Sequence, residues 1–206
     1  MTGMSKFVLI SSGTLAAMAG IGYLAFRSLT GATPVPANMH QVSLEDRAIS
    51  LQRRGAYLLA ALDCNACHSA HDQNWNLVPG SELAGHPATA PLPEWDPSLL
   101  KRNALMTMAP TGTAFAGPWG VSVAPNLTPD KETGIGSMTA EQLIASWRSN
   151  HHWNIDRPIL PPMPAPAYAA LTDDDIRAIH AYLMSLPPVK NKVPASVIAA
   201  PPPAAK

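Results

Sequence analysis

The chain has 206 residues, with 14 basic and 14 acidic side chains, a formal net charge of zero and 22 prolines. This length accommodates one ordinary domain with terminal extensions, and the many prolines and few aromatic residues predict irregular backbone around a modest core. The balanced charge excludes the basic surface that nucleic-acid-binding proteins present.

The first predicted element is an apolar segment at residues 7–26, which contains no charged side chain and lies between Lys6 and Arg27. A helix of this length spans ~30 Å, the thickness of the hydrocarbon core of a bilayer. We therefore expect residues 1–29 to form an N-terminal transmembrane anchor or uncleaved signal. A cleaved signal peptide is the alternative, with a small-x-small cleavage site at residues 17–19.

A linker and a long helix follow the apolar segment. Residues 30–42 contain two prolines and predict a short, semi-extended linker. Ser43, followed by acidic residues, has the pattern of a helix N-cap, and the spacing of apolar residues predicts a helix over residues 44–62. Gly55 lies inside this helix, where it indicates either a close contact with another helix or simple tolerance of glycine.

The predicted helix leads directly into Cys64, Cys67 and His68, which form the pattern Cys-x-x-Cys-His. This pattern is the attachment signature of a c-type haem. Each thiol adds across one vinyl group of the porphyrin, and the adjacent histidine becomes the proximal iron ligand. The chain has only these 2 cysteines. We therefore expect one covalently bound haem c, attached through Cys64 and Cys67 and ligated by His68.

Cysteines at this spacing have two other uses. A thioredoxin-like redox site lies between a strand and a helix, and no strand–helix alternation surrounds this motif. A zinc site could combine Cys64, Cys67, His68 and His71, but the consecutive Cys67 and His68 are poorly placed to bind one tetrahedral ion. The haem interpretation is therefore favoured.

Residues 69–125 show no sustained periodicity and are interrupted by prolines, so we expect loops, with one short helix considered near residues 97–105. A structureless stretch of this length argues against a compact domain unless it packs on a ligand. A buried haem would be such a ligand. The apolar side chains that could contact it are Leu83, Phe115, Trp119 and Val121.

Two further helices and a tail complete the predicted domain. Residues 139–148 begin with a hydroxyl side chain and place apolar residues on one face. Residues 172–186 begin with Thr172 as N-cap, followed by three aspartates that the helix dipole stabilises. Residues 189–206 are rich in proline and alanine and predict an extended or disordered tail.

Met163 is the predicted second axial ligand of the iron. It stands between Pro162 and Pro164, which restrict the backbone and fix the direction of the thioether. A methionine usually fills a core, and a methionine between prolines in a loop suits that role poorly. Ligation by histidine and methionine gives a higher potential than ligation by two histidines. The alternatives are Met106, Met108, Met138, His151, His152 and His180.

The order of these features resembles that of class I cytochromes c, with the haem motif in the N-terminal third and the methionine ahead of a C-terminal helix. Residues 125–136 (PNLTPDKETGIG) and residues 162–176 are similar to the cytochrome c subunits of membrane-bound periplasmic alcohol, aldehyde and gluconate dehydrogenases. The resemblance covers residues 53–193. Many of those subunits carry three haem motifs in tandem, whereas this chain has one.

The resemblance implies a mostly α, class I cytochrome c fold with long haem-wrapping loops and an N-terminal transmembrane helix, its cytochrome domain covering residues 43–188. It implies Cys64 and Cys67 as thioether attachments and His68 and Met163 as axial ligands. Asn126 and Trp119 lie in the matching block and are expected to line the haem or bond its propionates.

The function implied is one-electron transfer rather than catalysis, from a periplasmic dehydrogenase subunit or another redox protein toward the respiratory chain. The expected location is the bacterial inner membrane with the domain facing the periplasm, because c-type haem is attached on the outer side of that membrane. The alternatives are a haem enzyme or gas sensor with an open or labile distal site, in which Met163 does not bind iron, and an anchoring subunit whose haem is incidental.

Overall fold

The computed structural model describes residues 44–94, 96 and 106–199. The apolar segment at residues 7–26 and the short helix considered near residues 97–105 lie outside these ranges. Among the described residues, none of the helices has the length and apolar character needed to cross a membrane.

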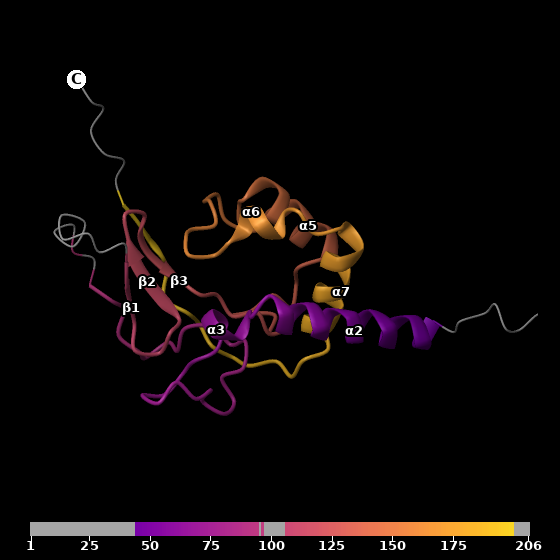
Figure 1. The fold of residues 1–206 in the computed structure, drawn as a ribbon, viewed down its shortest axis with the longest axis horizontal. Helices are drawn as coiled ribbons and strands as arrows, with labels where there is room; N and C mark the ends of the chain where they lie inside the picture. The colour runs from indigo at the N-terminus through magenta and orange to yellow at the C-terminus, as the bar shows by residue number, and fades with distance from the viewer. Residues whose placement is uncertain (1–43, 95, 97–105, 200–206) are drawn as a thin grey trace, which may run out of the picture. The chain divides into compact units, whose positions relative to one another are not determined.

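Five helices are described, and the three longer ones confirm the helices expected from the sequence (Figure 1). The helices are α2 (Leu44–Ala61), α3 (Asn65–His68), α5 (Ala140–Ser149), α6 (Ala165–Tyr168) and α7 (Asp173–Met184). Side-chain caps fix where α5 and α7 begin. Thr139 and Gln142 form a reciprocal capping box at α5, and the Thr172 hydroxyl accepts a hydrogen bond from the Asp175 amide at α7.

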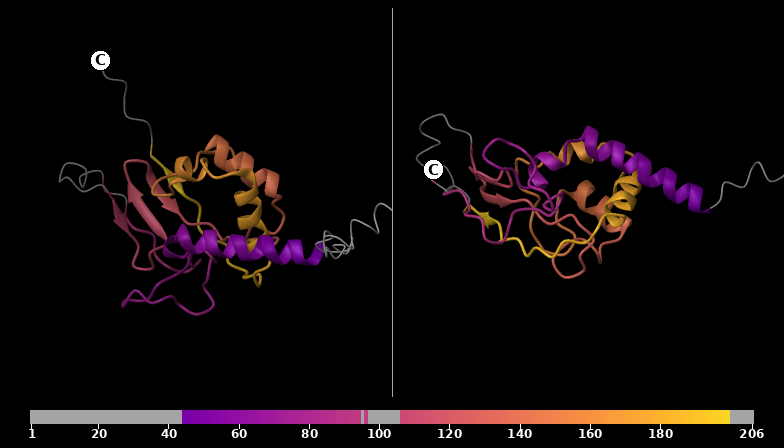
Figure 2. Two further views of the ribbon diagram at one scale, coloured as in Figure 1. Left: turned by 45° about the vertical axis from the view of Figure 1, so that its right-hand side comes forward. Right: turned by 90° about the horizontal axis from the view of Figure 1, so that it is seen from below.

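Helix α2 packs closely on α7 (Figure 2), and Gly55 lies at this contact. A Cβ atom added at Gly55 would lie 2.0 Å from the carbonyl oxygen of Ala178 and 2.7 Å from Cβ of Tyr182. Gly55 therefore marks a close contact between helices rather than mere tolerance of glycine. Beside this contact, Arg54 donates to the carboxylate of Asp175 at 2.9 Å.

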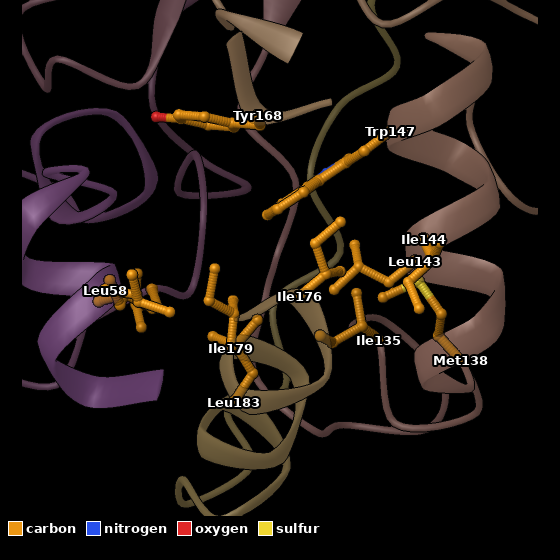
Figure 3. Close-up of a cluster of buried hydrophobic side chains, with 12 residues drawn as sticks. Leu58, Ile135, Met138, Leu143, Ile144, Trp147, Tyr168, Ile176, Ile179 and Leu183 are labelled. Carbon is orange, nitrogen blue, oxygen red and sulfur yellow. The ribbon is translucent and has the colours of Figure 1, made fainter. Parts of the chain in front are cut away.

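The main hydrophobic core lies between α2, α5 and α7, with α6 at its edge (Figure 3). Ile176 and Ile179 of α7 are almost completely buried at its centre. The rings of Trp147 in α5 and Tyr168 in α6 are in contact, with their centroids 5.3 Å apart, so α6 packs against α5. Other members of the cluster are Leu58, Leu59, Leu83, Ile135, Met138, Leu143, Ile144 and Leu183.

A four-stranded antiparallel sheet, ordered β1-β2-β3-β4, corrects the prediction that residues 69–125 form only loops. The strands are β1 (Thr107–Met108), β2 (Ala114–Gly117), β3 (Gly120–Val123) and β4 (Val197–Ile198). Gly117 pairs with Gly120, and Pro118 and Trp119 form the turn between them. Strands β2 and β3 are only four residues long and are buried at every residue, so they lack the sustained alternation of buried and exposed positions that identifies a strand. The fold is thus helical with a small sheet.

The folded domain also extends beyond residue 188, where the sequence analysis ended it. Residues 189–199, which we call the C-terminal strap, run in extended form along the domain. The Val189 carbonyl accepts a hydrogen bond from Asn126, and β4 in the strap pairs with β3. The sequence predicted an extended or disordered tail over residues 189–206; within the described part, the strap contains β4 and its backbone groups find partners in the domain.

Candidate functional site

The two cysteines lie on one turn of helix, directly after α2. Asp63, with φ of 53°, turns the chain between α2 and α3, and Cys64 is the N-cap of α3. Residues three apart on a helix lie on the same face, so Cys64 and Cys67 are neighbours. Both thiols are free and partly buried, and burial raises the pKa of Cys64 to about 11.

His68 is buried, with 6% of its surface exposed, and its Nδ1 lies 3.0 Å from the carbonyl oxygen of Pro125. A carbonyl only accepts hydrogen bonds, so Nδ1 carries the hydrogen and the lone pair of Nε2 is available to a metal. Burial lowers the pKa of His68, against the opposing effect of the Pro125 carbonyl, and favours the neutral ring. His68 is therefore in the form that ligates iron.

Gly85 holds Pro125 in this position. The Gly85 amide donates to the His68 carbonyl at 2.8 Å, and the His86 amide donates to the Ala124 carbonyl at 3.0 Å. Gly85 has φ of +77°, and a Cβ atom added there would lie 2.6 Å from the Ala124 oxygen and from the carbonyl carbon of Pro125. Only glycine permits both this backbone conformation and this approach.

Met163 lies in a loop that is bound to two other parts of the domain. It is partly buried and packs against the main hydrophobic cluster, which Cys64 also contacts. Before it, the Pro161 carbonyl accepts a hydrogen bond of 2.7 Å from the Ser122 hydroxyl on β3. After it, Tyr168 donates from its hydroxyl to the carbonyl of Leu62, near Cys64. The loop therefore connects the sheet to the end of α2.

The alternative ligands are placed differently. Met138 is 6% exposed within the core, and its carbonyl lies 2.9 Å from Nε2 of His180. Met106 and Met108 are exposed. His71, the fourth ligand in the zinc alternative, stacks on Trp75 with ring centroids 4.5 Å apart. Within the described ranges, no cluster of three or more histidine, cysteine or acidic side chains is arranged to hold a metal ion.

The two expected haem contacts, Trp119 and Asn126, differ in their hydrogen bonding. Nε1 of Trp119 is buried and has no hydrogen-bond partner among the described residues. Leaving such a donor unpaired costs about 1–3 kcal/mol, so this N–H suits an acceptor that a ligand would supply. Asn126 donates to Thr133 and Val189 and accepts twice from Thr128. Both of its amide hydrogens are used, which leaves none for a propionate.

These observations together fit a haem group. The described residues supply two neighbouring thiols, a neutral buried imidazole with Nε2 available, and a thioether in a loop that packs on the same cluster as Cys64. A covalently attached haem with histidine and methionine ligands uses these donor types.

Four supporting groups were not predicted from the sequence. Gly85, the Pro125 carbonyl and Tyr168 position His68 and the Met163 loop, as described above. Asn191 of the strap donates to the carbonyls on either side of Gly85. A glycine next to a histidine, or an asparagine in a proline-rich tail, gives no signal in a single sequence, because these contacts join residues far apart in the chain.

The sequence of this domain matches a known protein family. Residues 52–187 match the family model described as cytochrome c.

Individual relatives carry more specific descriptions. The chain is 32% identical over 153 residues to the fructose dehydrogenase cytochrome subunit of Gluconobacter japonicus, covering 74% of this chain and 23% of that protein. It is 32% identical over 135 residues to the gluconate 2-dehydrogenase cytochrome c subunit of Pantoea cypripedii, covering 66% and 23%. It is 31% identical over 153 residues to the cytochrome c subunit of the quinone alcohol dehydrogenase of Gluconobacter oxydans, covering 73% and 25%. The chain thus spans about a quarter of the length of these relatives.

Proposed function

This chain belongs to the cytochrome c family, and we propose that it carries single electrons through one covalently bound haem c, as an electron-transfer partner of a dehydrogenase. The observation that carries the proposal is the hydrogen bond from Nδ1 of His68 to the carbonyl of Pro125. His68 directly follows Cys67 in the haem-attachment motif. It leaves Nε2 of a buried, neutral imidazole available as an iron ligand.

In this proposal Cys64 and Cys67 would hold the haem through two thioether bonds, and His68 and Met163 would ligate its iron. When bound, the haem supplies one-electron chemistry, with iron alternating between the ferrous and ferric states. The hydrogen bond to Pro125 strengthens His68 as a donor, which stabilises ferric iron, whereas the Met163 thioether favours ferrous iron. The two ligands therefore act on the potential in opposite directions.

The electron donor we propose is a dehydrogenase that oxidises an alcohol, an aldehyde, a sugar or a sugar acid. Support comes from the relatives, which are named as cytochrome subunits of fructose, gluconate and alcohol dehydrogenases. Since the chain spans only about a quarter of their length, the shared region is the cytochrome module rather than the whole subunit. The acceptor we propose is a component of the respiratory chain.

The location we propose is the bacterial inner membrane, with the domain facing the periplasm. Two arguments support this location. The apolar segment at residues 7–26 is long enough to span a bilayer, and c-type haem is attached on the outer side of that membrane.

Substrate-dependent reduction of the haem tests the proposed partner. The protein would be purified from native membranes in mild detergent, and alcohols, aldehydes, sugars and sugar acids would be added one at a time. Rapid appearance of the reduced haem spectrum with one substrate would show that a dehydrogenase co-purifies and donates electrons. Reduction by ascorbate but by none of the substrates would contradict stable association with such a dehydrogenase.

Replacement of Met163 separates the electron-transfer proposal from a haem enzyme or gas sensor with an open distal site. Met163→Ala should abolish the weak far-red sulfur-to-iron band of the oxidised protein. Met106→Ala, an exposed methionine, is the matched control and should leave the band intact. An oxidised spectrum that is identical in wild type and Met163→Ala would favour the open-site alternative.

A further inference from the structure

We propose that Asn191 in the C-terminal strap is a positioning residue for the His68–Pro125 hydrogen bond, and that it thereby helps to set the potential of the iron. The proposal rests on the proposed function, in which His68 is the axial ligand. Asn191 lies outside the region matched by the cytochrome c family model, which ends at residue 187.

The side chain of Asn191 is surrounded by backbone groups of one short segment. Its Nδ2 donates to the carbonyl of Ala84 at 2.7 Å and to the carbonyl of His86 at 2.9 Å. Its Oδ1 accepts from the amide of Ala88 at 3.1 Å. Both amide hydrogens and the oxygen are therefore used, and residues 84–88 curve around this one side chain.

Gly85 lies between Ala84 and His86, the two residues whose carbonyls Asn191 binds. It contacts both His68 and Pro125, the partners of the hydrogen bond that orients His68. Its amide donates to the His68 carbonyl at 2.8 Å. Its Cα faces Pro125 so closely that an added Cβ would lie 2.7 Å from the Pro125 oxygen. Asn191 binds the carbonyls of the two residues that flank Gly85, so it helps to hold the surface against which the Pro125 carbonyl rests.

A second side chain, His86, also holds this segment and should keep it folded when Asn191 is replaced. His86 is fully buried, and its ring lies 2.8 Å from the Thr113 hydroxyl and 3.2 Å from the carbonyl of Ala90. The segment is thus anchored on one side by His86 and on the other by Asn191. Loss of Asn191 should loosen the position of Gly85 without releasing the segment.

The direction of the effect follows from the role of the hydrogen bond. Donation from Nδ1 to a carbonyl raises the basicity of the ligating nitrogen. When the Pro125 carbonyl is held less firmly, His68 becomes a weaker donor and ferric iron is stabilised less. Replacement of Asn191 should therefore raise the midpoint potential.

The test compares midpoint potentials of the full-length haem-loaded protein in three forms: wild type, Asn191→Ala and Ser196→Ala. Ser196 is the matched control, because its hydroxyl also joins the strap to the domain, through the amide of Val123 on β3. At a fixed ambient potential we expect Asn191→Ala to raise the ferrous-to-ferric ratio roughly three- to tenfold, where tenfold corresponds to about 59 mV for one electron. Asn191→Ser, which retains one donor, should give a smaller shift of the same sign.

The outcomes distinguish this inference from the proposed function. A wild-type protein without covalent haem, or whose haem spectrum and midpoint potential are unchanged by His68→Ala, would refute the proposed function itself. If wild type behaves as proposed and Asn191→Ala has the potential of Ser196→Ala, the positioning role is refuted alone. Failure of both Asn191 variants to accumulate haem-loaded protein, while Ser196→Ala accumulates normally, would assign Asn191 to folding and would also overturn the positioning role.

Discussion

The Ser122 hydroxyl and the Pro161 carbonyl are 39 residues apart in the chain and are joined by a hydrogen bond of 2.7 Å. Ser122 lies in β3 and Pro161 lies two residues before Met163. The small sheet, which the sequence did not predict, therefore holds the loop that carries the proposed methionine ligand.

Ser122→Ala should weaken methionine ligation. Loss of this hydrogen bond should lower the free energy of unfolding by about 1 kcal/mol and let the Met163 loop detach more readily. We expect the far-red band to disappear at a lower urea concentration than in wild type, ahead of global unfolding monitored by circular dichroism. Ser185→Ala is the control, because the hydroxyl of the exposed Ser185, at the end of α7, donates to the nearby carbonyl of Tyr182. Loss of the band at the same urea concentration in all three proteins would contradict the role of Ser122.

Gly85→Ala should damage the proximal side of the site far more than Gly80→Ala. Both glycines have positive φ, of +77° and +83°, so alanine at either position adds backbone strain of about 1–2 kcal/mol. At Gly80 nothing lies within 4 Å of the added Cβ, whereas at Gly85 it meets Ala124 and Pro125. The yield of haem-loaded protein and its unfolding midpoint measure the difference. Equal losses in the two variants would show that crowding at Pro125 is unimportant.

Gly55→Ala should destabilise the domain strongly, although alanine is the better helix former. On an exposed helix this change would add up to about 1 kcal/mol of stability. Here the added Cβ would lie 2.0 Å from the Ala178 oxygen, and separating α2 from α7 should cost about 1–3 kcal/mol or more. Urea unfolding measures the change, with Ser50→Ala on the exposed part of α2 as the control. A more stable Gly55→Ala protein would show that α2 and α7 can accommodate a Cβ atom at this contact.

The Arg54–Asp175 pair should stabilise the domain in a pH-dependent way. The hydrogen bond from Arg54 holds the pKa of Asp175 below its ordinary value of 3.8. A carboxyl whose pKa is lowered by folding contributes its stabilisation above the ordinary value and loses it as the pH falls through the lowered value. Arg54→Gln should therefore lower the unfolding midpoint at neutral pH, and the difference from wild type should shrink in acid.

The control for this pair is Arg53→Gln, which removes the same charge from the neighbouring exposed position. Measuring both variants in urea at a series of pH values separates the pair from the net charge. A difference between Arg54→Gln and wild type that persists unchanged into acid would assign the effect to lost packing of Arg54 on Tyr57 instead.

The sequence predicted the helices well because local features determine where they begin. Thr139 and Thr172 supply the hydrogen bonds that start α5 and α7, and both residues were recognised as hydroxyl caps. Helix α2 ends within one residue of its prediction. These signals lie within a few residues of the structure they determine.

The sheet and the strap were missed because they depend on distant partners. Strand β2 consists of Ala114, Phe115, Ala116 and Gly117, a composition that does not suggest a strand. Strand β4 has only two residues and forms because β3 is available to pair with it. The residues of the candidate site fall into the same two groups, those recognised from local sequence and those that depend on distant partners. Its ligands were predicted by motif, whereas the groups that orient them come from the far end of the chain.

The packing of α2 on α7 also bears on how the haem could be attached. Arg54 and Asp175 are 121 residues apart, so this contact closes almost the whole domain into one loop and cannot form until α7 has been synthesised. Attachment requires reactive thiols, and in the folded protein burial raises the pKa of Cys64 to about 11, which leaves little thiolate. Until α7 packs on α2, the hydrophobic cluster against which Cys64 packs is incomplete, so we expect its thiol to be more exposed before folding than in the folded domain.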